Sequence, residues 1–165
     1  MNDKERDCFS SGEDEEGDVF FIPREIAGKL VCKLTRELIE TLDEIEDVAN
    51  VVIPDSVTSI GVGAFRGYDN LKSVKIPQSV TSVEESAFEG CTSLKSVKIP
   101  DSVTSIGEDA FNGCTSLTNV EIPDSVTSIG DNAFDRCDKL ASVEIPANVK
   151  LEDAFPESCR VIRRK

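Results

Sequence analysis

Residues Ile99–Leu117 read IPDSVTSIGEDAFNGCTSL, and nearly the same phrase occurs on both sides of them. The stretch from Ile76 reads IPQSVTSVEESAFEGCTSL, and the stretch from Ile122 reads IPDSVTSIGDNAFDRCDKL. Cutting the chain before each Ile-Pro pair from Ile53 onward gives four units of 23 residues (53–75, 76–98, 99–121 and 122–144) and a shortened fifth unit, 145–162. One such unit cannot bury its apolar side alone, so the repetition predicts a stack of similar coils with a continuous core.

Each unit contains a short pattern that is typical of a strand. It follows the form Leu-x-x-Leu-x-Leu in Leu71–Ile76, Leu94–Ile99, Leu117–Ile122 and Leu140–Ile145, with a weaker copy at Val48–Ile53. The final Val-x-Ile alternates with period two, which places two apolar side chains inward and the residue between them outward. Each coil also has an Ala-Phe pair, such as Ala110-Phe111, and we expect these phenylalanines to stack as a spine about 4.8 Å apart.

The cysteines follow the same period. Cys91, Cys114, Cys137 and Cys159 occupy one position in successive units, where the first unit has Tyr68. We expect a buried ladder of reduced thiols, because free cysteine behaves as a small apolar residue. A metal or redox site is the alternative, but a stack of coils spreads these thiols along a line, whereas a metal needs converging ligands. The glycines before this ladder, Gly67, Gly90 and Gly113, should have positive φ, and Arg136 breaks their series.

The unit IPDSVTSIGEDAFNGCTSLTNVE resembles the BspA-like leucine-rich repeat, a class with 23 residues per repeat, and the resemblance covers residues 48–162. It implies a short right-handed solenoid with a parallel β-sheet face, and turns and second extended segments on the other sides. It also implies binding rather than catalysis. Bacterial members of this family are often cell-surface adhesins.

The region before the repeats has a different composition. Residues 1–18 contain eight acidic and two basic side chains, which favours disorder. A helical stripe made by Ile26, Leu30, Leu34 and Leu38 predicts a helix from Pro23 to about Glu46. We therefore expect residues 19–47 to form an α-helical cap over the first coil, with a helical docking or dimerisation segment as the alternative. Residues 163–165 form a basic tail.

The composition excludes several classes of function. The formal net charge of −14 disfavours nucleic acid and anionic lipid surfaces as partners. No apolar run is long enough to span a membrane, and the N-terminus lacks the pattern of a secretory signal, so the expected location is the cytoplasm. Nothing in the sequence predicts an oligomer, and a monomer is expected.

The sequence gives little support to an enzyme. It contains no histidine, and we find no phosphate-binding loop or nucleophile motif. The acidic pairs Glu84-Glu85 and Glu108-Asp109 fall in a variable loop, where they are expected to form a solvated rim. No catalytic residue, cofactor or metal is expected. Ser10 and Ser11 precede a run of acids and are candidate phosphorylation sites for an acid-directed kinase.

The positions where the repeats differ are the best candidates for recognition. The outward residues of the predicted strands are Ser73, Lys75, Ser96, Lys98, Asn119, Glu121, Ser142 and Glu144. Their charge changes from lysine to glutamate along the sheet, which suits a dipolar peptide or protein partner. Keeping the sheet soluble is the alternative role. The predicted function is a non-catalytic protein-interaction module; the alternatives are a cell-surface or secreted adhesion protein and a regulatory repeat domain of a larger protein.

Overall fold

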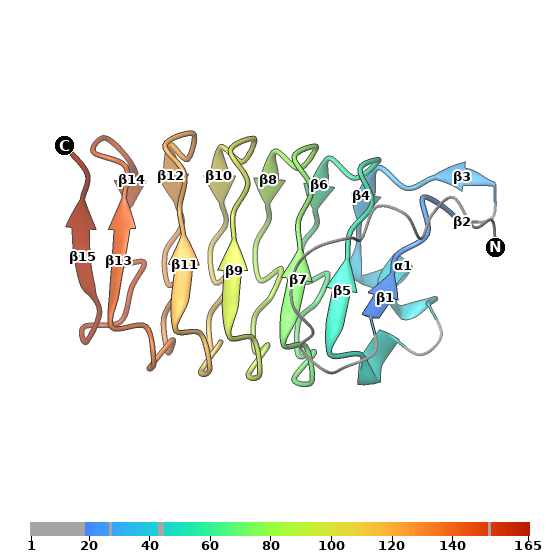
Figure 1. Ribbon diagram of the computed structural model, residues 1–165, viewed down its shortest axis with the longest axis horizontal. Helices are drawn as coiled ribbons and strands as arrows, with labels where there is room; N and C mark the ends of the chain where they lie inside the picture. Colours follow the sequence, from blue (N-terminus) through green and yellow to red (C-terminus); the bar gives the residue numbers. More distant parts are fainter. Residues whose placement is uncertain (1–18, 27, 43–44, 152) are drawn as a thin grey trace.

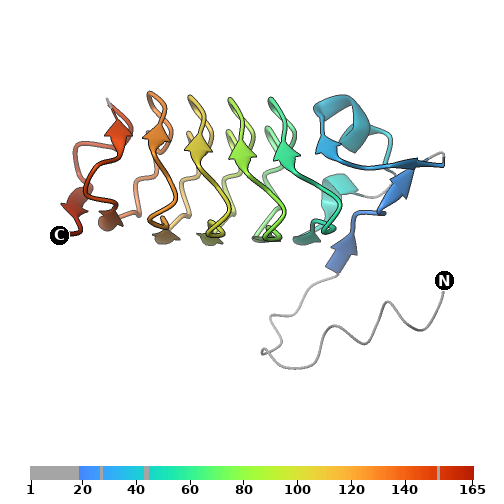
Figure 2. The same ribbon diagram turned by 90° about the horizontal axis from the view of Figure 1, so that it is seen from above.

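The computed structural model of the protein describes residues 19–26, 28–42, 45–151 and 153–165. These residues form a stack of coils that follow one another in sequence order along the long axis of Figure 1. Two rows of strands run along different sides of the stack, as Figure 2 shows from above. The predicted repeat solenoid with a parallel sheet face is therefore confirmed.

The longer strands lie side by side along one side of the stack (Figure 1), and we call this side the strand face. They are β1 (Val19–Phe21), β5 (Asn50–Val52), β7 (Ser73–Lys75), β9 (Ser96–Lys98), β11 (Asn119–Glu121), β13 (Ser142–Ile145) and β15 (Arg160–Arg163). All of their hydrogen-bonded pairings are parallel. In β7, β9 and β11 the middle residue is buried and its two neighbours are exposed, as the period-two pattern predicts.

The second row of strands forms a six-stranded parallel sheet. Its members are β4 (Lys33–Leu34), β6 (Ser59–Ile60), β8 (Ser82–Val83), β10 (Ser105–Ile106), β12 (Ser128–Ile129) and β14 (Lys150–Leu151). The threonine before each central strand ties its coil to the coil before it. Thr81 donates its backbone N–H and its hydroxyl to the Thr58 carbonyl oxygen, at 2.9 and 3.2 Å, and Thr104 and Thr127 repeat this contact. The recurring Thr-Ser pair therefore serves the stacking of the coils.

The core is a set of identical side chains stacked along the solenoid axis. The rings of Phe65, Phe88, Phe111 and Phe134 are fully buried, and Phe155 continues the column. Successive ring centroids are 5.0 to 5.2 Å apart and the rings are nearly parallel. This confirms the predicted spine, at close to the spacing of paired strands.

The turns use glycine for two different reasons. Gly67, Gly90 and Gly113 have φ of 72 to 76°, as predicted, and Arg136 adopts the same left-handed conformation at 56°. Gly107 instead allows the backbones to come close together, because a Cβ there would lie 2.6 Å from the Glu85 nitrogen. Gly61 and Gly130 repeat the close approach of Gly107, whereas the second unit has Glu84 at this position.

The predicted N-terminal helical cap is wrong for most of its length. Residues 19–47 contain β1, a hairpin of β2 (Glu25–Ile26) and β3 (Lys29–Leu30), β4, a five-residue helix α1 (Arg36–Glu40) and a 3₁₀ turn, Ile45–Asp47. β1 pairs with β5, and β4 pairs with β6, so this segment is an irregular first coil of the solenoid. Strand pairing at the open ends of both rows outweighed the weak local preference for helix.

The short helix α1 contacts the next coil. Its N-cap is Thr35, whose side-chain oxygen accepts from the Leu38 N–H. Arg36 lies over the ring of Tyr68, 5.2 Å from its centroid, and donates to the Arg66 carbonyl oxygen. Figure 2 shows α1 in line with the loops that follow the short strands of later coils. The helix therefore takes the place of an ordinary turn of the repeat.

Candidate protein-binding face

The eight predicted face residues lie on four neighbouring strands, β7, β9, β11 and β13, and all eight are exposed. They form two rows that cross the strands. We call Ser73, Ser96, Asn119 and Ser142 the polar row, and Lys75, Lys98, Glu121 and Glu144 the charged row. The register of β9 and β11 places Ser96 beside Asn119 and Lys98 beside Glu121, which confirms that the coils align these positions.

The pairing of the outer strands extends both rows. Asn50 lies beside Ser73, and Val52 lies beside Lys75. At the other end Arg160 lies beside Ser142, and Ile162 lies beside Glu144. The charged row is therefore bounded by an apolar side chain at each end.

Two contacts made by residues of these rows are exposed to solvent. The Lys98 Nζ lies 3.8 Å from the Glu121 Oε2, and these two side chains are 80% and 64% exposed. The Ser73 hydroxyl donates to the Asn50 Oδ1 at 2.7 Å. An ion pair this exposed contributes little to folding, because water already solvates both charges. The charges of the row remain accessible to a partner.

A shallow groove runs over the acidic half of the strand face. Its volume is about 560 Å³, and its lining includes Lys98, Asn119, Glu121, Ser142 and Glu144 from the predicted set. Ser73, Lys75 and Ser96 lie outside it. The groove thus brings together five of the eight predicted residues.

The lining of the same groove also includes residues that the sequence analysis did not mark as functional, among them Ile162 and Arg164 from the last coil. Arg164 donates to the Ile122 carbonyl oxygen at 2.6 Å and pairs with Asp124 at 2.8 Å. The shortened last unit hid these residues, although the adjacent β-branched residues Val161 and Ile162 favour a strand. Arg163, which the sequence places in the basic tail, is the last residue of β15.

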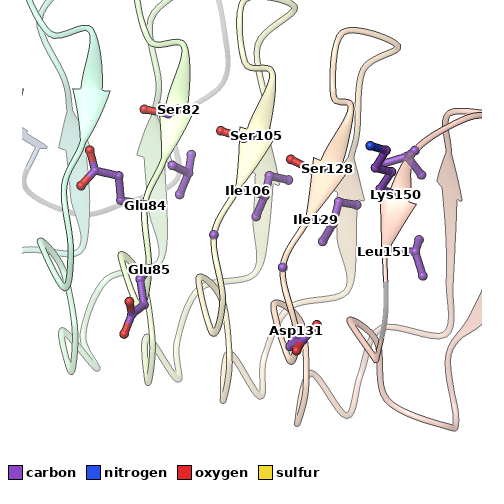
Figure 3. Close-up of a pocket in the computed structure, with 14 residues that line it drawn as sticks. Ser82, Glu84, Glu85, Ser105, Ile106, Ser128, Ile129, Asp131, Lys150 and Leu151 are labelled. Carbon is purple, nitrogen blue, oxygen red and sulfur yellow. The ribbon is translucent and has the colours of Figure 1, made fainter.

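A second groove, of about 800 Å³, lies on the six-stranded sheet. Figure 3 shows the hydroxyls of Ser82, Ser105 and Ser128 pointing the same way from three neighbouring strands. Glu84, Glu85 and Asp131 contribute carboxylates to its lining, and Lys150 contributes an amine. No aromatic side chain lines it, so it offers no stacking surface for a ring.

The best-connected carboxylate near this groove has a structural role. Glu84 accepts from the Lys33 amine at 2.8 Å and from the Ser59 hydroxyl at 2.6 Å. Burial alone would raise the pKa of Glu84, but these hydrogen bonds and the Lys33 charge outweigh it and hold the pKa below its usual value. An ionised carboxylate in an ion pair ties the first coil to a later one and is a poor proton donor at neutral pH.

The thiol ladder is a feature of the core. Cys91, Cys114 and Cys137 are fully buried, and their Sγ atoms donate to the carbonyl oxygens of Phe65, Phe88 and Phe111 at 3.1 to 3.3 Å. Burial raises the pKa of Cys91 to about 12 and also raises the pKa of Cys114 and Cys137. These thiols are protonated and inaccessible, unlike a reactive cysteine. Cys159 is only half-buried.

Other sequence-based candidates can be placed more briefly. Ser10 and Ser11 lie outside the described residues, so their phosphorylation stays a prediction. Among the described residues no group of three or more cysteine or acidic side chains is arranged to hold a metal ion. No helix in the described part of the chain is long and apolar enough to cross a membrane.

These features define a leucine-rich-repeat protein with an open, polar strand face. They are the parallel strands on one face, the coil of 23 residues and the stacked core (Figure 1). The sequence model of the family described as BspA type leucine-rich repeat region matches residues 41–162 in six copies. The chain belongs to this family.

Solved structures of similar proteins agree with this assignment. A leucine-rich repeat protein of T. pallidum is 28% identical with a TM-score of 0.70, and the match covers 89% of this chain and 73% of that one. A leucine-rich cell surface protein of Faecalibacterium prausnitzii is 33% identical with a TM-score of 0.64, covering 89% of this chain and 32% of that one. A pneumococcal vaccine antigen, at 22% identity and a TM-score of 0.70, covers 95% of this chain and 42% of that one and shows the fold alone. No curated protein matches the sequence significantly.

Proposed function

We propose that this protein is a non-catalytic protein-interaction module that binds a protein or peptide partner through its strand face. The observation that carries the proposal is the charged row. Its side chains are exposed, and the Lys98–Glu121 pair contributes little to the fold, yet the row divides into a basic half, Lys75 and Lys98, and an acidic half, Glu121 and Glu144. Lys72 and Lys95, exposed beside the same strands, add to the basic half.

This charge pattern defines the chemistry of a fitting partner. An acidic segment would lie over β7 and β9, and a basic segment over β11 and β13. The groove beside β11 and β13 adds Ile162, whose side chain offers an apolar contact. Complementary charge of this kind governs orientation and the rate of encounter more than it governs affinity. Nucleic acid is a poor candidate because the protein carries a formal net charge of −14.

Cytoplasmic location is part of the proposal. The cysteines within the described ranges are free thiols, as is usual in a reducing compartment. A second candidate is adhesion at a cell surface, which is favoured by the similarity to a cell surface protein of F. prausnitzii. Cell fractionation separates the two: recovery from the cytosol supports an intracellular module, and recovery from the surface supports adhesion.

The experiment is an affinity pull-down from the source organism under reducing conditions. The wild type is compared with Lys75→Glu/Lys98→Glu and with a control, Lys29→Glu/Lys150→Glu. Both variants change the net charge equally, and the control residues are exposed on β3 and β14, outside the strand face. A partner kept by the wild type and the control but lost by the face variant supports the proposal. Equal recovery by all three would overturn it.

A further inference from the structure

The charged row is self-complementary when it is reversed. The strand register aligns Phe21, Val52 and Lys75, then Lys98 and Glu121, then Glu144 and Ile162. The 23-residue period of the coils places these three groups in one line. The part of this line that is self-complementary runs from Val52 on β5 to Ile162 on β15, and Phe21 on β1 lies beyond it. If a second copy of this row is turned end for end and laid over the first, each lysine of one copy faces a glutamate of the other. The apolar residue at each end of one copy faces the apolar residue at the opposite end of the other. The centre of this symmetry lies between β9 and β11, at the Lys98–Glu121 pair.

We propose that two copies of this chain associate through their strand faces, with their solenoid axes antiparallel. The two-fold axis runs parallel to the strands, between β9 and β11. It brings Lys98 of each copy to Glu121 of the other, so that four charges alternate at the centre. Lys75 meets Glu144 further out, and Val52 meets Ile162 at the ends. Such a contact is isologous, because the same residues supply both sides of it.

The rest of the face fits this arrangement. Lys72 and Lys95, beside the basic half, meet the positions of Ala141 and Thr118, which carry no charge. The polar row has short side chains, serine and asparagine, that allow two sheets to approach to the usual spacing of about 10 Å. A lysine and a glutamate, extended towards each other, span that gap.

The alternative ways of joining two copies are less favourable. Stacking the faces with the coils in the same order would place lysine over lysine and glutamate over glutamate. Two copies joined at their β15 strands would bring Arg160 and Arg163 of each copy together. Only the antiparallel face-to-face contact pairs opposite charges throughout the row.

The expected dimer is weak and dependent on salt. Six strands at about 4.8 Å spacing give a contact strip about 25 Å long, which is typical of a transient interface. Each copy also carries a formal net charge of −14, and this long-range repulsion is screened at an ionic strength of 0.15 M, where the Debye length is about 8 Å. The monomer expected from the sequence is then the state at low concentration.

This inference rests on the proposed role of the strand face, and it names the partner as a second copy. The test is sedimentation equilibrium at 0.15 M salt over a wide range of protein concentration. Two variants are compared with the wild type: Lys75→Glu/Lys98→Glu, which makes the row entirely acidic, and Glu121→Lys/Glu144→Lys, which makes it entirely basic. Circular dichroism verifies that both variants fold.

We expect the wild type to dimerise and each variant alone to dissociate at least about tenfold more readily, because every pair in the row becomes repulsive. Mixing the acidic and basic variants should restore a 1:1 dimer. A wild type that stays monomeric at the highest soluble concentration would overturn the inference, as would variants that dimerise as well as the wild type. The two proposals can fail separately. If the wild type stays monomeric, but the pull-down recovers a different protein with the wild type and not with Lys75→Glu/Lys98→Glu, only the dimer is refuted and the proposed function stands.

Discussion

Lys98 and Glu121 lie side by side on β9 and β11, with the lysine Nζ 3.8 Å from the glutamate Oε2. Their Cα positions pair in a parallel ladder, in which the coil period places equivalent repeat positions next to each other. At this pair the charge of the strand face changes sign. The role of the strand face depends on whether these two side chains serve folding or recognition.

A double-mutant cycle separates these roles for the Lys98–Glu121 pair. We expect Lys98→Ala, Glu121→Ala and the double variant to give a coupling of about 0.2–1 kcal/mol or less in the free energy of unfolding, because both side chains are exposed. Urea titration of the four proteins measures it. A coupling well above this range would assign the pair to the stability of the sheet.

The two kinds of glycine should respond differently to alanine. A Cβ at Gly107 would lie 2.6 and 2.7 Å from backbone atoms of Glu85 and Glu84, so Gly107→Ala should cost about 3 kcal/mol. At Gly113 the nearest atom would be 3.7 Å away and only the positive φ is unfavourable, so Gly113→Ala should cost about 1–2 kcal/mol. Equal unfolding free energies for the two variants would contradict this distinction.

Arg136 occupies a conformation that suits glycine. Its φ of 56° corresponds to that of Gly113 one coil earlier, and its side chain makes only an exposed ion pair with Asp135 at 3.7 Å. Arg136→Gly should therefore stabilise the protein by about 1 kcal/mol. The free energy gained by relieving the backbone strain is larger than the entropic cost of the more flexible unfolded chain. A lower melting temperature for this variant would show that the arginine makes an unrecognised contribution.

The buried thiols make stability depend on alkaline pH. The pKa of Cys91 rises from 9.0 to about 12 on folding, so below pH 9 the thiol is protonated in both states and its contribution is intact. Between these values only the unfolded chain loses the proton, and the free energy of unfolding falls by about 1.4 kcal/mol per pH unit for this thiol.

The Cys91→Ala variant tests this dependence. It should be less stable at pH 7 but should lose stability more slowly than the wild type between pH 9 and 10.5, as measured by urea titration at several pH values. An identical slope in the two proteins would mean that Cys91 ionises in the folded state.

The repeats made most of the fold predictable from sequence. Residues such as Phe111 and Cys114 recur at one period, so the same position could be compared in several coils. The structure confirms the predicted phenylalanine spine and the buried thiols. The outward positions of the strands followed from alternation alone. What they bind did not follow, because a lysine and a glutamate on a sheet suit both solubility and recognition.

The N-terminal segment was mispredicted for a physical reason. Leu30, Leu34 and Leu38 recur every four residues, as in a helix, but Leu30 is 54% exposed and Leu34 is fully buried in β4. The backbone of residues 33–34 pairs with β6, an interaction that local sequence does not encode. Gly28 was a local sign that a helix would be interrupted, and its φ in the structure is 73°.

The central claim is that the strand face is the recognition surface, and site-specific photo-crosslinking tests it most directly. A photoreactive amino acid replaces Ser96 in the middle of the face or, as the matched control, Ser105 on the six-stranded sheet. Both proteins are irradiated in cells of the source organism, and the adducts are identified by mass spectrometry. We predict adducts, with a partner or with a second copy, from position 96 and not from position 105. Adducts confined to position 105, or absent from both positions, would contradict the account.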